Sequence, residues 1–308
     1  MGSRAGWLRV RLAGVSAFAA LALVVPSRAQ RPMAPIDWKQ VNQGLGKSGA
    51  LQPDGAYKVG LPRGDLHVIA AGVAVKPTLA LGSWVAFLQV SDTAVMLMGD
   101  LVLVEGEVGP VLDKLRESGI EETALHNHLL HESPHVMYMH IGGQGAPAKL
   151  AAAVHAALAL TGTPFGASPT ATPAVSFDID TAQIGAILGF HGKINGGVYQ
   201  VGVPRGERIT ADGIDVPASM GLATAINFQP TGGGKAAITG DFVLIGSEVN
   251  QVIRALRNNG VAITALHSHM LNESPRLFFM HYWANDDALK LARGLRAALD
   301  GMNVKKPN

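Results

Sequence analysis

Histidine side chains are concentrated in two short stretches of this sequence. "ALHNHLLHESPHVMYMH" runs from Ala124 to His140 and holds five of the eleven histidines, and "ALHSHMLNESPRLFFMH" runs from Ala265 to His281 and holds three. Neutral imidazoles are good ligands for first-row transition metals. An H-x-H pair followed by a glutamate and a further histidine, written twice, therefore predicts metal binding.

Strand geometry indicates which histidines act together. Residues two apart on a β-strand share a face, and the Glu-Ser-Pro sequence at Glu132–Pro134 is typical of a turn. A three-residue loop there places His126 opposite His140 and His128 opposite Tyr138. We expect the same arrangement in the second stretch, with zinc as the first choice of ion and copper, iron or manganese as alternatives. The expected ligands are His126, His128 and His140 in one set and His267, His269 and His281 in the other.

Glu132 and Glu273 lie at the two turns. Each could complete a metal shell or remain unbound as a general base beside a metal-held water. The opposite strand face carries Leu125, Leu129 and Met139, and we expect it to pack beneath helices. The alternative to metal binding is that these histidines are ordinary hydrogen-bonding residues, present twice because the two stretches share a fold.

The histidine pattern also resembles that of cupins, which place a glutamate and a later histidine after H-x-H. The helical pattern before the motif and the short return to His140 do not suit a jelly roll. The glycine expected after the glutamate is absent as well. We therefore do not expect a cupin fold.

The two stretches belong to an internal duplication that covers nearly the whole chain. "GAYKVGLPRGDL" (55–66) matches "GVYQVGVPRGER" (197–208), and "MGDLVLVEGEV" (98–108) matches "TGDFVLIGSEV" (239–249). Between the copies, residues 161–176 are rich in Pro, Thr, Ser and Gly and are typical of a linker. We expect repeat 1 at 36–160 and repeat 2 at 177–301.

Each repeat reads as an α+β unit with an antiparallel sheet and amphipathic helices. Asp37 and Asp180 are expected to cap a short first helix. Apolar residues recur at helical spacing over 107–118 and 248–259, and Gly119 and Gly260 follow as end signals. In each repeat, the strand that precedes this helix is followed by the helix, two strands and a second helix. The two sheets are expected to pack around a pseudo-twofold axis.

The first 29 residues have the pattern of a secretory signal peptide. A positively charged start precedes the apolar run 12–25, which is short for a membrane span, and Ser27 and Ala29 are the small residues before a cut at Gln30. An uncleaved anchor is the alternative. No later stretch has membrane-spanning length, so we expect a periplasmic or secreted protein.

Composition limits the chemistry further. The chain has 308 residues, a net charge of +2, 48% hydrophobic residues and no cysteine. The absence of cysteine excludes disulfides and thiol ligands, and the absence of a basic run argues against nucleic acid as a partner.

Arg63 and Arg205, in the repeated Pro-Arg-Gly-acid motif, are candidates for binding an anionic substrate, with pairing to the neighbouring acid as the alternative. Tyr138 is a further candidate contact for a small-molecule or cell-envelope ligand.

The two histidine stretches, together with "LALGSWVAF" (79–87) and "MGDLVLVEGEV", resemble the LppY/LpqO family of bacterial exported proteins. The resemblance extends over the mature chain and implies the two-copy build, but it implies no reaction. Its mycobacterial members are lipoproteins, whereas this chain lacks the required cysteine. Three functions stay open: a metal-binding protein, a metal-dependent hydrolase with Glu132 or Glu273 as base, and a non-catalytic module for a cell-envelope ligand.

Overall fold

The computed structural model describes residues 2, 33–166 and 177–306. The chain divides into two units, Met1–Met33 and Ala34–Asn308. The predicted signal peptide (1–29) lies outside the described residues apart from Gly2, and so does most of the predicted linker. All that follows concerns the second unit.

The two repeats have the same order of elements. In the first repeat these are α1 (Lys39–Leu45), β1 (Ala50–Leu51), β2 (Tyr57–Pro62), β3 (Ile69–Ala70), β4 (Val73–Ala74), α2 (Pro77–Ala80), β5 (Gly82–Gln89), β6 (Val95–Val104), α3 (Glu105–Glu117), β7 (Glu121–His126), β8 (Glu132–Ser133), β9 (Val136–Gly145) and α4 (Pro147–Leu158). In the second they are α5 (Thr181–Leu188), β10 (Lys193–Asn195), β11 (Val198–Pro204), β12 (Thr210–Ala211), β13 (Ile214–Asp215), η1 (Ala218–Met220), β14 (Ala223–Gly232), β15 (Lys235–Ile245), α6 (Val249–Asn258), β16 (Ala262–His267), β17 (Glu273–Ser274), β18 (Leu277–Asp287) and α7 (Ala288–Leu299). The predicted duplicated α+β fold is confirmed.

Each repeat contains a six-stranded antiparallel sheet. The strand orders are β1-β2-β5-β6-β9-β7 and β10-β11-β14-β15-β18-β16, which are equivalent under the duplication. The central strands β6 and β15 are buried on both faces, as strands between two packed layers must be.

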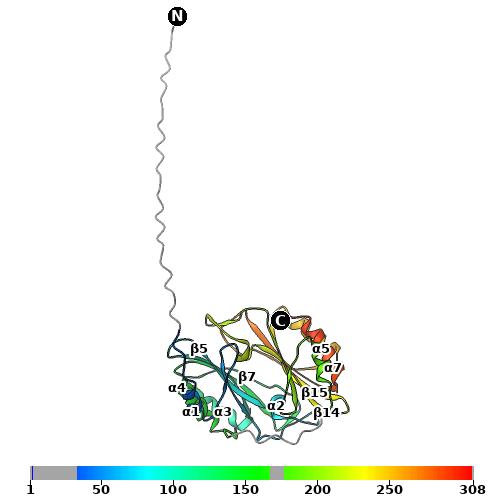
Figure 1. Cartoon of the computed structure of the whole chain (residues 1–308), viewed down its shortest axis with the longest axis horizontal. Helices are drawn as coiled ribbons and strands as arrows, with labels where there is room; N and C mark the ends of the chain where they lie inside the picture. The colour runs from blue at the N-terminus through cyan, green and yellow to red at the C-terminus, as the bar shows by residue number, and fades with distance from the viewer. Residues whose placement is uncertain (1, 3–32, 167–176, 307–308) are drawn as a thin grey trace. The chain divides into compact units, whose positions relative to one another are not determined.

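Helices cover one face of each sheet. In the first repeat Met139 of β9 joins a core with Val111 of α3 and Leu150 of α4, and in the second Met280 and Leu256 belong to the equivalent core. Figure 1 shows α1, α3 and α4 beside one repeat and α5 and α7 beside the other. The helices thus take one face of each sheet and leave the opposite face for the other repeat.

Two further clusters join the unoccupied faces. One contains Met98 from the first repeat and Phe279 from the second, and the other contains Tyr138 from the first and Trp283 from the second. Tyr138 and Phe279 occupy matching positions, so the two clusters are equivalents under exchange of the repeats. The sheets therefore pack face to face about a pseudo-twofold axis, in the order helix, sheet, sheet, helix.

The helix ends follow the sequence signals closely. Asp180 caps α5 through a hydrogen bond from the backbone N–H of Gln183 (2.9 Å). Asp37 accepts from the N–H of Lys39 (3.0 Å), but α1 begins one residue later than predicted, after Trp38. Gly119 and Gly260 follow the caps of α3 and α6 with φ of 75° and 76°, a left-handed conformation that glycine adopts without a steric cost.

The hairpin register differs from the prediction by two residues. His126 lies opposite Tyr138, and His140 lies opposite Ala124. The connection is also longer than three residues, because Glu132–Ser133 leaves the large sheet as β8 and pairs with β3. A shift of two residues keeps every side chain on its predicted face, so His126 and His140 still share one face.

The predicted apolar face is confirmed only in part. Met139 packs in the helix-side core, but Leu129 is buried in the cluster of Tyr138 between the repeats, and Leu125 is 41% exposed because β7 lies at the edge of its sheet. Within the predicted linker, Thr163 is buried and Phe165 packs against the first core. Among the described residues no helix is both long and apolar enough to cross a bilayer.

Candidate metal centre

Six histidines meet between the two sheets. The rings of His126 and His267, which occupy matching positions in the two repeats, are 3.5 Å apart between centroids. The other four lie around this pair: His128, His140, His269 and His281. Three overlapping groups of three histidines have ligand atoms within 4.8 Å of one another. The two predicted ligand sets therefore form a single cluster.

The ligand groups cross between the repeats. His126 and His128 of the first repeat form a group with His281 of the second. The ring centroids of His281 and His128 are 3.7 Å apart, and so are those of His140 and His269, the equivalent pair. The predicted set His267, His269 and His281 is also one of the three groups, and the remaining group is His126, His140 and His267.

Equivalence between the repeats divides the six histidines into two triads, of which triad A is one of the three close ligand groups and triad B is its counterpart under the duplication. In triad A, His126, His128 and His281 have ring separations of 5.1, 3.7 and 5.3 Å. In triad B, His267, His269 and His140 have separations of 5.0, 3.7 and 5.7 Å. Each triad takes the H-x-H pair of one repeat and the later histidine of the other.

Asp100 and Asp241 bring two carboxylates to the triads. Asp100 lies opposite His140 in the β6–β9 ladder, and Asp241 lies opposite His281 in the β15–β18 ladder. An Asp241 oxygen is 3.2 Å from Nε2 of His269, and an Asp100 oxygen is 3.8 Å from Nε2 of His128. Asp100 therefore lies beside triad A, whereas Asp241 lies beside triad B and also 3.9 Å from Nε2 of His281 in triad A.

The Nε2 atoms of the six histidines lack hydrogen-bond partners. All six Nε2 atoms are buried and form no hydrogen bond. An oxygen of Asp241 lies near Nε2 of His269, but the two atoms are not aligned as a hydrogen bond requires. Nδ1 of His281 lies 2.7 Å from the carbonyl oxygen of Gly240, so it must donate and leave a lone pair on Nε2. Nδ1 of His126 has the same relation to the carbonyl of Asn127 (3.2 Å). Such lone pairs fit a metal ion, and leaving them unpaired is costly.

Burial keeps these imidazoles neutral. Removal from water lowers the pKa of all six, to about 4 for His126 and His281, and the neighbouring imidazoles lower several of them further. Burial raises the pKa of Asp241 to about 6 and that of Asp100 well above its usual value. Neutral imidazole is the form that binds metal, so the six imidazoles are in the metal-binding form near neutral pH.

Two threonines fix the H-x-H segments from the opposite repeat. Thr123 and Thr264 stand at irregularities in the ladders of β7 and β16. The hydroxyl of Thr123 donates to the carbonyl of His269 (2.6 Å), and that of Thr264 donates to the carbonyl of His128 (2.6 Å). Bulges often redirect side chains in this way, and here each repeat positions a ligand of the other.

A cavity of about 1260 Å³ reaches the cluster. Its walls come from both repeats, with strands β2 and β5 on one side and β11 and β14 on the other. Five of the eight donor residues line it: His128, His269, His281, Asp100 and Asp241. Typical small-molecule pockets have volumes of about 300–1,000 Å³, so the centre is accessible to a sizeable ligand.

Glu132 and Glu273 have other partners. An oxygen of Glu132 is 2.7 Å from Nδ1 of His135, and Glu273 accepts from the N–H of Leu277 (3.1 Å) and contacts Arg276. Neither belongs to the histidine groups of the described chain or to the cavity lining. Their role as a base stays a prediction.

The predicted substrate contacts are buried in the structure. Tyr138 stacks on His128 at 3.3 Å and donates to the carbonyl of Ala80 (2.8 Å). It does not line the cavity.

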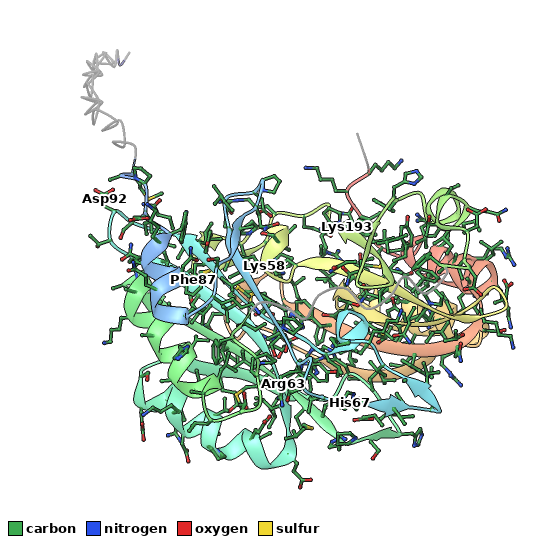
Figure 2. The ribbon with its side chains drawn as sticks, turned by 60° about the horizontal axis from the view of Figure 1, so that its bottom comes forward. Lys58, Arg63, His67, Phe87, Asp92 and Lys193 are labelled. Atoms are coloured by element: carbon green, nitrogen blue, oxygen red, sulfur yellow. The ribbon has the colours of Figure 1, made fainter. Side chains whose placement is uncertain are left out.

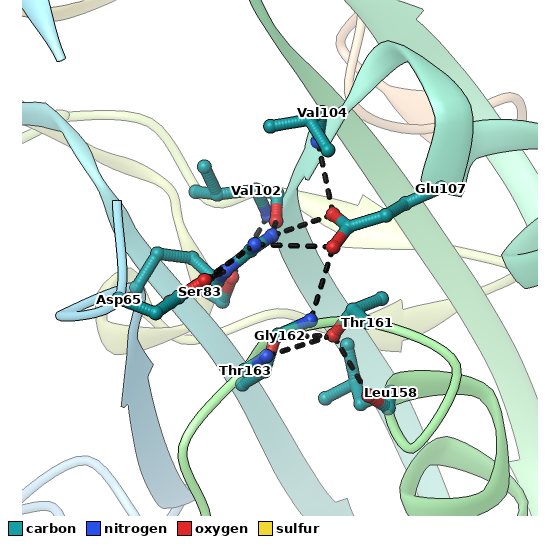
Figure 3. Close-up of polar contacts among 10 residues, drawn as sticks. Asp65, Ser83, Val102, Val104, Glu107, Leu158, Thr161, Gly162 and Thr163 are labelled. Carbon is teal, nitrogen blue, oxygen red and sulfur yellow. Dashed lines mark hydrogen bonds and ion pairs between the residues drawn. The ribbon is translucent and has the colours of Figure 1, made fainter. Parts of the chain in front are cut away.

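Arg63 and Arg205 pair with acids, as the alternative interpretation held. The guanidinium of Arg63 bonds Asp65, Glu107 and the carbonyl of Val102, which uses all of its N–H groups (Figure 3). Arg205 makes the same contacts with Glu207, Glu248 and the carbonyl of Val243. Neither side chain has a donor left for a ligand.

The sequence interpretation missed the two aspartates and the two threonines. An aspartate inside an apolar strand, present in both "MGDLVLV" and "TGDFVLI", was the available signal, because a charge buried in a sheet needs a partner. The threonines stand three residues before each H-x-H pair, but no local pattern shows that they reach the other repeat.

Comparison with known proteins gives a family without an assigned function. No curated protein matches the chain. Two solved structures are similar: a trimeric bacterial microcompartment shell protein, PduB, at 13% identity over 85% of this chain and 97% of that one, with a TM-score of 0.22, and EtuB from Clostridium kluyveri, at 10% identity over 82% and 91%, with a TM-score of 0.20. A family model matches residues 39–160 and 182–301, one match in each repeat. The chain belongs to the family described as Domain of Unknown Function (DUF1259).

Proposed function

We propose that this protein binds divalent transition-metal ions at the interface between its repeats. The observation that carries the proposal is the set of six histidines whose buried Nε2 atoms have no hydrogen-bond partner. Histidine and carboxylate donors suit zinc best, and copper, iron or manganese are alternatives.

The division into triads supports two ions per chain. Triad A is a close ligand group, and triad B is its counterpart by ring separation; with Asp100 and Asp241 respectively, each supplies three imidazoles and one carboxylate, a number of donors that suits zinc. Because each triad draws on both repeats, one repeat by itself would supply only two histidines to one ion and one to the other.

A second candidate function is metal-dependent catalysis, which the cavity favours. A purely structural zinc site is closed by protein ligands, whereas a catalytic site keeps a position open. A bound divalent ion would act there as a Lewis acid. The carboxylates that face the cavity are Asp100 and Asp241, so in this candidate they take the role of base that the sequence suggested for Glu132 and Glu273.

Elemental analysis tests the metal proposal. Protein purified without chelators is expected to contain about two equivalents of transition metal. Removal of the metal should lower the melting temperature, because an ion that binds only the folded chain stabilises it. Protein without transition metal that also shows no thermal shift with zinc, copper, iron or manganese would rule the proposal out.

We also propose export to the periplasm or the medium, as the LppY/LpqO resemblance and the first 29 residues suggest. N-terminal sequencing of protein from the native host should give a mature chain that begins at or near Gln30. A chain that retains Met1 would contradict processing by signal peptidase.

A further inference from the structure

The cavity walls do not share the symmetry of the metal centre. Ladder positions equivalent to Gly60, Trp84, Asp100 and His140 are occupied by Gly202, Ala225, Asp241 and His281 in the second repeat. The aspartate and histidine are therefore the same in both repeats, whereas the tryptophan of the first repeat is replaced by an alanine in the second. Differences of this kind change the shape of the cavity in which a small molecule could bind, but they leave the metal-binding side chains the same.

Lys58 is the most notable of these differences. It lies on β2 beside Gly60, and the equivalent residue in the repeated motif is Gln200. Its ammonium lies 4.1 Å from the centre of the Trp84 ring and donates to the carbonyl of Ser219 in the other repeat (2.8 Å). Figure 2 places Lys58 beside the yellow ribbon of the second repeat.

The ammonium of Lys58 is held in place and only partly bonded. An ammonium has three N–H donors, and within the described residues one hydrogen bond is formed. Burial lowers the pKa of Lys58 to about 8, while Asp100 and Asp54 oppose the change, so the group is charged near neutral pH. A desolvated cation with free donors favours a charged acceptor, since such hydrogen bonds are strong.

The other charges around the cavity agree with an anionic ligand. Of the described lining residues, the basic ones besides histidine are Lys47, Lys58 and Lys76, and the acidic ones are Asp100 and Asp241. Lys47 and Lys76 each donate to a backbone carbonyl, of Gly166 and Gly197 respectively. The two carboxylates lie at the histidines, where divalent ions would more than neutralise them, and this leaves the cavity positive.

The remaining lining is largely apolar. Trp84, Leu79, Phe177 and Ile194 contribute to the walls, and a Cβ built on Gly60 or Gly202 would meet nothing within 4 Å. The space therefore admits a body of some size next to the charged end.

We propose that the cavity binds a small organic oxyanion, a carboxylate or a phosphate-type group on an apolar body, with the anionic group between the Lys58 ammonium and the histidine centre. The inference rests on the proposed metal centre and specifies the class of ligand that this centre acts on or holds. Trp84 positions the ammonium, and the open side at Ala225 accommodates the apolar body.

Calorimetric titration of the metal-loaded chain tests this inference, with benzoate and phenylphosphonate as probes and benzamide as the neutral control. Both anions are expected to bind, and benzamide at least about 10-fold more weakly. Lys58→Gln, which introduces the residue of the equivalent position, should weaken anion binding by about 10-fold or more, the usual effect of losing a charged hydrogen bond. Lys193→Gln removes the same charge from an exposed residue that does not line the cavity, and it should bind like the wild type.

Metal content measured on the same samples separates the two proposals. It should be equal in the wild type and both lysine variants, and its absence from the wild type would overturn the metal centre itself. With metal present, three results would overturn the oxyanion inference: no binding of either anion, equal affinity for benzamide, or no effect of Lys58→Gln. Ala225→Trp gives an independent check, because filling the open side should weaken phenylphosphonate far more than inorganic phosphate.

Discussion

Replacement of His128 and His281 by alanine is expected to remove one of two metal ions and leave the other in place. Both residues belong to triad A, where their rings are 3.7 Å apart, and triad B keeps its three histidines. Replacement of His128 and His140 also removes two histidines, but it takes one from each triad. In the crossed arrangement that variant is expected to lose both ions during dialysis against a weak chelator, because each triad keeps only two imidazoles.

The two double variants distinguish sites that combine histidines of both repeats from sites that lie within one repeat. If each repeat held its own ion, His128 and His140 would share one site, and the results would be reversed. Metal content by elemental analysis gives the answer directly. Equal losses in the two variants would contradict both arrangements and indicate one ion shared by the whole cluster.

The fold should survive these substitutions. The apolar clusters on both sides of the histidines are unchanged, and each alanine removes a buried Nε2 that has no protein partner, with one further hydrogen bond lost at His281, from Nδ1 to the carbonyl of Gly240. A matched control replaces two histidines outside the cluster, with His67→Ala and His131→Asn. Both are exposed, and asparagine tolerates the positive φ of 59° at position 131. This control should keep both ions.

Strand periodicity predicted the face that each histidine occupies, although the register was wrong. Side-chain direction depends only on whether a position is odd or even, so a shift by two residues left His126 and His140 on the same face. The Glu-Ser-Pro turn was wrong for another reason. Its pairing with β3 joins segments more than 60 residues apart, and nothing in the local sequence specifies that contact.

The crossing of ligands between repeats could not be derived from the sequence. Alternation gives the inner face of each sheet, but the relative position of two packed sheets depends on the whole interface, including Met98, Phe279 and Tyr138. The same limit applies to Arg63. Asp65, two residues away, was a predictable partner, whereas Glu107 reaches it only because α3 begins directly after β6.

Replacement of Arg205 by methionine is expected to lower the free energy of unfolding by about 3–5 kcal/mol, the usual cost of breaking a buried ion pair from one side. Arg205 and Glu248 are buried, and their atoms approach to 2.7 Å. Glu248 also accepts from the backbone N–H groups of Ile245 (2.9 Å) and Asn303 (2.8 Å). The ion pair therefore links the end of β15, the start of α6 and the C-terminal segment, and methionine would leave a buried carboxylate without its cation.

Urea denaturation measures this effect, with Arg208→Met as the matched control. Arg208 also pairs with an acid, Asp215, but both side chains are largely exposed, and exposed ion pairs contribute little to stability. The control should therefore unfold close to the wild-type midpoint. Equal midpoints for the two variants would show that the buried pair does not stabilise the fold. Metal content and benzoate affinity of folded Arg205→Met should match the wild type, because every N–H of this guanidinium bonds within the protein. A selective loss of benzoate binding would instead restore Arg205 as a substrate contact.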